Sequence, residues 1–134
     1  ITANQLLIEN LERLIEEFPK LVSQDKSFLT LEQKEEGVFK IIITGFDDTI
    51  GNILQNYIAS KMIDESSILS VCGYKKTHPL EDTIFFIISL NRKNKIFQLN
   101  KPQQVVAIIE QLNEACNGLI QVYSLIIKEA EQKL

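Results

Sequence analysis

The feature that most constrains the fold is a pair of hairpin-like segments. Residues 27–46 are rich in β-branched and aromatic side chains, with a turn-forming stretch at 34–37 between the two halves. Residues 68–75 and 83–90 have the same chemistry on either side of a turn near 77–79. Strands that follow each other through short turns pair antiparallel, because parallel strands need a long crossover connection. The sequence therefore predicts an antiparallel four-stranded sheet.

Helical patterns lie before, between and after these strand pairs. Residues 2–18 are amphipathic and begin with a possible capping box, whereas 48–62 return to a period of 3.6 residues. Pro102 opens a long third helix that runs to about residue 133. We therefore predict an α+β two-layer sandwich, with the sheet packed against a short and a long helix and with an extra N-terminal helix. Residues 1–26 form the N-terminal helix region, and 27–134 form the main domain.

The long final helix has more apolar surface than one sheet can cover. It would extend roughly 45 Å, and its apolar residues form two stripes, which indicates a second packing partner. Gly51 and Gly118 interrupt the second and third helices, either as weak points or as places of close approach. Close crossing of these helices at an interface would suit both glycines. Residues 96–99, just before the final helix, could form a short extra strand.

Charge and cysteine content exclude several classes of protein. The chain has 14 basic and 18 acidic residues, and residues 37–134 are neutral overall, which disfavours general nucleic-acid binding. The longest uncharged stretch is too short for a membrane span. Cys72 and Cys116 lie in apolar runs 44 residues apart, as expected for buried free thiols in a reducing compartment. No cofactor and no metal are expected.

Few residues suggest catalysis. Asp47 and Asp48 could hold Mg²⁺, but an acidic pair at the start of a helix is more simply a cap. His78 could act as a general base, yet a histidine before a proline in a turn is usually structural. No nucleophile motif or phosphate-binding loop is present. We therefore expect no catalytic residue.

Two segments resemble signatures of one family. Residues 47–54, Asp-Asp-Thr-Ile-Gly-Asn-Ile-Leu, resemble the Asp-His-Thr-Leu-Gly-Asn motif of the small alpha-like assembly subunit of multisubunit DNA-directed RNA polymerases. Residues 73–81 resemble that family's Tyr-Lys-x-x-His-Pro-Leu element, and 115–117 match part of its final helix. Asp48 departs from the family's histidine. The motif residues carried by this resemblance are Asp47, Asp48, Thr49, Tyr74, His78 and Pro79.

The resemblance implies a non-catalytic role in transcription. Family members pair with a larger alpha-like subunit through the helix after the Gly-Asn motif and through the long final helix, and the pair forms the platform on which the catalytic subunits assemble. The interface residues expected here are Ile50, Gly51, Asn52, Ile53, Leu54, Tyr57, Leu112, Leu119, Tyr123 and Ile126.

The N-terminal helix resembles the C-terminal dimerisation helix of the larger partner. Residues 1–26 are therefore either an extension of the small subunit or, because the chain also starts without methionine, the end of a fused large-plus-small chain similar to those of some large cytoplasmic DNA viruses. The expected location is intracellular: the nucleus of a cell, or the host cytoplasm or virion for a virus. The isolated chain could form a homodimer, and neither membrane nor specific nucleic-acid contact is expected. The alternative is a homodimeric nucleic-acid-binding regulator that uses the basic loop 92–101.

Overall fold

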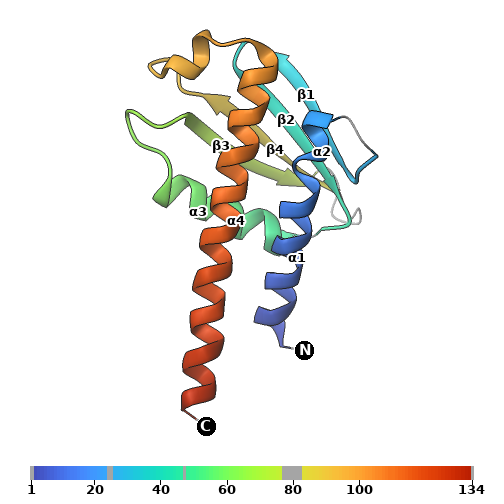
Figure 1. Ribbon diagram of the computed structural model, residues 1–134, viewed down its shortest axis with the longest axis vertical. Helices are drawn as coiled ribbons and strands as arrows, with labels where there is room; N and C mark the ends of the chain where they lie inside the picture. Colours follow the sequence, from blue (N-terminus) through green and yellow to red (C-terminus); the bar gives the residue numbers. More distant parts are fainter. Residues whose placement is uncertain (1, 24–25, 47, 77–82, 134) are drawn as a thin grey trace.

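The two strand pairs form one four-stranded antiparallel sheet in the computed structural model, which describes residues 2–23, 26–46, 48–76 and 83–133. The strand order is β1-β2-β4-β3, so β2 and β4 lie in the centre. The predicted α+β sandwich with an N-terminal helix is confirmed (Figure 1). The strands are β1 (Leu29–Glu35), β2 (Val38–Thr44), β3 (Leu69–Lys76) and β4 (Thr83–Leu90).

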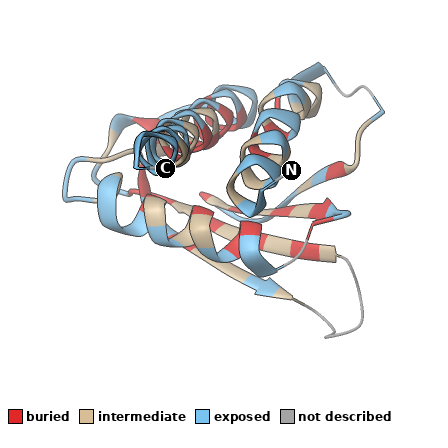
Figure 2. Ribbon diagram, turned by 90° about the horizontal axis from the view of Figure 1, so that it is seen from below, coloured by how far each residue is buried: buried red, intermediate tan, exposed pale blue. Residues whose placement is uncertain are grey.

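Alternation along the central strands separates the two faces of the sheet. In β4 every second residue is buried, and β2 has the same period of two. The buried face carries Phe39, Ile41, Ile43, Ile84, Phe86 and Ile88. Figure 2 shows that the helices lie on this side of the sheet and that the buried residues gather between the two layers.

The N-terminal helix α1 (Ala3–Glu17) begins where the capping box predicts. The backbone N–H of Thr2 donates to Gln5 Oε1 at 2.9 Å, and the N–H of Gln5 donates to Thr2 Oγ1 at 3.1 Å. Its apolar side packs against the final helix, where Leu11 and Leu14 are fully buried. Pro19 follows the end of the helix, and a short helix α2 (Lys20–Ser23) leads toward β1.

The remaining helices complete the covering layer. Helix α3 (Asp48–Lys61) packs mainly on β3 through Ile50, Leu54 and Ile58. Helix α4 (Lys101–Gln132) is capped by Asn100, whose side chain accepts from the N–H of Gln103 at 3.0 Å. Buried residues occur along α4 only as far as 119, and Figure 1 shows its C-terminal half projecting beyond the sheet.

The predicted extra strand at 96–99 is wrong. Residues Lys95–Gln98 form a short 3-10 helix, η1. Asn94 starts it by accepting from the N–H of Ile96 at 2.8 Å, and the carbonyl of Ile96 accepts from the N–H of Leu99 at 3.2 Å. Strand β4, which precedes this segment, already has a neighbour on each side, so it offers no edge for a further strand.

Candidate functional site

The described parts of the two signature segments, 48–54 and 73–76, lie side by side in the fold. The first provides Asp48 in the opening turn of α3, and the second provides Tyr74 on β3. The hydroxyl of Tyr74 donates a hydrogen bond to Asp48 Oδ1. The backbone N–H of Tyr74 also donates to Gln55 Oε1 at 2.7 Å. These bonds join the start of α3 to β3, so both motifs stabilise one internal junction.

Gly51 leaves room for the tyrosine ring at this junction. A Cβ at position 51 would overlap the Tyr74 ring atoms themselves. The ring is also 6.1 Å from the ring of Phe86, between centroids, so the two rings pack together. The Tyr74 ring of the same chain thus explains why the Gly-Asn motif has a residue without a Cβ at position 51.

Gly118 on α4 has a similar neighbour. A Cβ there would overlap the hydroxyl end of Tyr57, which reaches across from α3. The close approach predicted at both glycines is present. Its partner in each case is a tyrosine of the same chain rather than the backbone of another helix.

The ten predicted interface residues divide into three groups by burial. Five of them are buried in the core of this chain, and Ile53, Tyr57 and Tyr123 are only partly buried. Asn52 and Ile126 are exposed. The buried five are Ile50, Gly51, Leu54, Leu112 and Leu119. Contact between any of the ten and a partner stays a prediction.

The projecting end of α4 presents large apolar side chains to solvent. Val122, Leu125 and Ile126 are 44%, 60% and 44% exposed, and their spacing of three and four places them on one side of the helix. Leu6 of α1, on the neighbouring helix, is 50% exposed. Sequence reasoning included only Ile126 of these four. Val122 could have been included, because it follows Leu119 by three residues and so continues the apolar stripe of the helix.

Several predicted residues have no described structure. Asp47, His78 and Pro79 lie outside the described residues, whereas Thr49 is exposed in the first turn of α3. Within the described ranges, no three His, Cys, Asp or Glu side chains come together as metal ligands. The carboxylate of Asp48 is bonded to Tyr74 instead.

The basic loop at 92–101 holds its aromatic side chain inside the fold. The guanidinium of Arg92 lies 5.4 Å from the ring centroid of Phe97, and that ring packs against Gly37. Gly37 has a φ of +73°, a turn conformation that favours glycine. Phe97 is therefore engaged and is not free to stack on a nucleic-acid base.

The two cysteines are buried free thiols, as predicted. Burial raises the pKa of Cys72 to about 12 and that of Cys116 to about 12 as well. A thiol with such a pKa is protonated at neutral pH and is a poor nucleophile.

Comparison with known proteins gives one informative match. The chain is 36% identical over 100 residues to the probable DNA-directed RNA polymerases I and III subunit RPAC2 of Caenorhabditis elegans. The match covers 75% of this chain but only 58% of the relative, so the chain spans well under two thirds of that protein. No protein-family model matches the chain. The match supports the resemblance to polymerase subunits that the two motifs carry.

None of the helices that the structure describes combines the length and the apolar character needed to cross a bilayer.

Proposed function

We propose that this chain is a non-catalytic assembly subunit of a DNA-dependent RNA polymerase. In this role it pairs with a larger alpha-like subunit, and the pair forms the platform for the catalytic subunits. The two signature segments and the 36% identity to a polymerase subunit support the family assignment. The exposed apolar surface of α4 supports the pairing itself.

The observation that carries the pairing is the exposed apolar end of α4. Val122, Leu125 and Ile126 are exposed and follow Leu119, the last buried residue of α4. Apolar side chains grouped on one side of a helix lose contact with water when a second helix packs against them. A partner that supplies such a helix would cover this end of α4 together with Leu6 on α1.

The experiment must separate loss of pairing from loss of folding. Leu54 and Leu119 are buried in this chain, so a charge at either position would act on the fold first. The better variant is Leu125→Asp combined with Ile126→Asp, because both side chains are exposed. The matched control is Ser124→Asp, which adds a carboxylate at an exposed position on the other side of the same turn.

The readout is the composition of the complex purified through an affinity tag on this chain in its source. We expect the tagged chain and the Ser124→Asp control to recover the catalytic polymerase subunits and a larger alpha-like subunit. The Leu125→Asp, Ile126→Asp variant should recover neither, with its circular dichroism unchanged. Recovery of the chain alone or as a simple homodimer, without polymerase subunits, would refute the proposed function.

Two finer inferences, on fusion and on location, belong to the same proposal. We infer that the chain continues from a fused larger partner, as in some large cytoplasmic DNA viruses, because α1 packs against α4 as a second dimerisation helix would. Its location would then be the host cytoplasm or virion, and the nucleus if the source is cellular. The mass of the tagged chain tests the fusion, since a fused chain carries the mass of both alpha-like subunits and would be recovered without a separate larger alpha-like subunit.

A further inference from the structure

An apolar groove lies at the edge of the sheet, away from the signature segments. Its volume is about 510 Å³, and it is bordered by α2, β1 and the first turns of α4. Apolar side chains form most of its lining, including the exposed Val22 and Val106. The described residues that line it are Lys20, Leu21, Val22, Leu29, Thr30, Leu31, Lys101, Pro102, Val105 and Val106.

Strand β1 presents free backbone groups beside this groove. The N–H of Thr44 donates to the carbonyl of Phe28, so the residues that bond to β2 are Phe28, Thr30 and every second residue after them. The backbone N–H and C=O of Leu31 therefore point away from β2, toward the open edge. No hydrogen bond from the described residues reaches them. Strand β1 is the edge of the sheet, and such groups can pair with an added strand.

Charges protect only the second half of this edge. Glu32 and Lys34 form an ion pair at 3.1 Å, and charged residues at a sheet edge discourage pairing with other chains. The first half, residues 29–31, is Leu-Thr-Leu and carries no charge. The unprotected half of the edge is thus the half that lines the groove.

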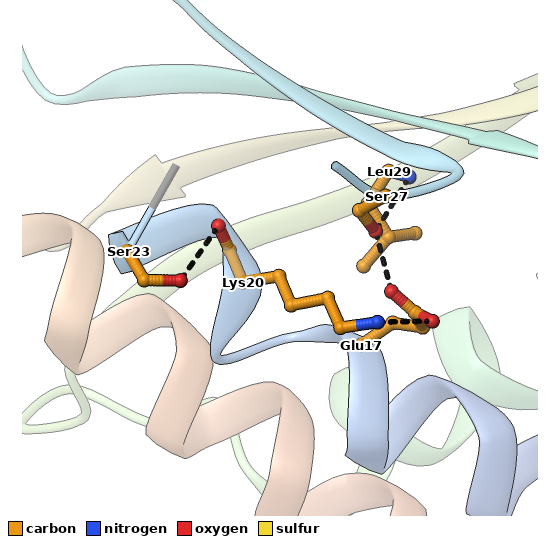
Figure 3. Close-up of polar contacts among 5 residues, drawn as sticks. All are labelled: Glu17, Lys20, Ser23, Ser27 and Leu29. Atoms are coloured by element: carbon orange, nitrogen blue, oxygen red, sulfur yellow. Dashed lines mark hydrogen bonds and ion pairs between the residues drawn. The ribbon is translucent and has the colours of Figure 1, made fainter. Parts of the chain in front are cut away.

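The wall of the groove is fixed by a polar network (Figure 3). Lys20 Nζ lies 2.9 Å from Glu17 Oε1, and Ser27 Oγ donates to Glu17 Oε2 at 2.7 Å. These hydrogen bonds, that from Lys20 first, lower the pKa of Glu17. Ser27 Oγ also accepts from the N–H of Leu29 at 3.1 Å. The network holds α2 against the beginning of β1, so the groove is formed before any ligand arrives.

The available charge in the groove is positive. The ammonium of Lys20 is already paired with Glu17, and Lys101 has no ion pair among the residues that the structure describes. Lys101 also begins α4, where the positive end of the helix dipole favours an anion. Among the residues that the structure describes, no acidic side chain lines the groove.

We propose that this groove binds an extended peptide segment of a protein partner, which adds to β1 as a fifth strand. Its backbone pairs with Leu31, its apolar side chains lie on Val22 and Val106, and an acidic side chain reaches Lys101. The site does not depend on the proposed polymerase role, because it lies on the opposite end of α4 from the projecting apolar surface.

A phage-displayed library of random linear peptides, selected against the 134-residue chain, tests this proposal. We expect enriched sequences in which β-branched or aromatic residues alternate with polar ones near an acidic residue. In ¹⁵N spectra, the synthetic form of such a peptide should shift the amide signals of Leu31 and its neighbours. Failure to enrich any peptide, or enrichment of basic or proline-rich sequences only, would overturn the proposal.

Four variants distinguish the groove from non-specific binding. Leu31→Pro removes the edge N–H without breaking a bond to β2 and also replaces the Leu31 side chain in the groove lining, so it should weaken binding by roughly fivefold to tenfold. Val106→Asp and Lys101→Glu should weaken binding at least as much. Ala130→Asp, the matched control at an exposed position of the same helix outside the groove, should leave binding unchanged.

Thermal unfolding identifies any variant that fails to fold. Because Val106 and Lys101 are exposed, their variants keep the test decisive even if Leu31→Pro does not fold. Equal binding by Val106→Asp, Lys101→Glu and the unmodified chain would refute the groove as the site. The peptide selection and the binding of the variants do not depend on whether the tagged chain recovers polymerase subunits.

Discussion

Replacement of Gly51 by alanine tests how the two signature segments are joined. Alanine stabilises the interior of a helix relative to glycine by up to about 1 kcal/mol. Here its Cβ would overlap the body of the Tyr74 ring, which cannot move without losing its hydrogen bond to Asp48 and its packing near Phe86. The lost hydrogen bond contributes about 1 kcal/mol, and partial exposure of the ring costs about 1–2 kcal/mol more. Gly51→Ala should therefore lower the free energy of unfolding by about 1–2 kcal/mol after the helix gain is subtracted.

A double-mutant cycle separates the two contributions. In a Tyr74→Ala background the obstruction is gone, so Gly51→Ala should stabilise the protein by about 0.5–1 kcal/mol. The assay is urea unfolding of all four proteins, followed by far-UV circular dichroism. The expected result is a change of sign between the two backgrounds. If Gly51→Ala changed stability by the same amount with and without the tyrosine ring, the explanation of this glycine would be refuted.

Three further substitutions or titrations follow from the structure. In Gly118→Ala the new Cβ would meet only the hydroxyl end of the half-buried Tyr57, which can swing away. Urea unfolding should therefore show a change in the free energy of unfolding below about 1 kcal/mol. A loss above about 2 kcal/mol would contradict this reasoning. Cys72 and Cys116 should resist thiol reagents at neutral pH until the chain is unfolded. Their pKa values in the folded protein are about 12, against an ordinary value of 9.0, so the unfolded chain loses these protons at a lower pH than the folded chain. The free energy of unfolding should therefore fall between about pH 9 and pH 12, by at most about 1.4 kcal/mol per pH unit for each thiol. A pH-independent free energy of unfolding in this range would be the contrary result. Leu54→Asp should cost more than about 3 kcal/mol, because it buries an unpaired charge, and retention of the native circular dichroism signal would contradict the described core.

Local patterns in the sequence predicted most of the helices and strands. The capping box of Thr2 and Gln5 marks the start of α1, and the alternating side chains of β4 identify a strand with one buried face. These signals depend on residues within a few positions of each other. The segment 96–99 has strand-forming side chains but becomes η1, because its backbone bonds go to Asn94 and to its own turn.

The candidate site could be predicted only in part. The signature segments were recognisable from their residues, but their contact through Asp48 and Tyr74 joins positions 26 residues apart. The predicted interface included Leu54 and Leu119, which are apolar in the sequence whether they face a partner or their own core. Hydrophobic periodicity identifies an apolar side of a helix without stating what covers it.

What the sequence determined by itself was therefore the local structure: the four strands, the main helices, their caps and the absence of a basic surplus. The tertiary structure decided which apolar residues remain exposed. Along α4, residues as far as Leu119 lie over the sheet and α1, whereas Val122 and Leu125 have passed beyond that layer. The side chains are chemically alike, and only the position of the helix relative to a sheet of limited size distinguishes a core residue from a surface that can bind a partner.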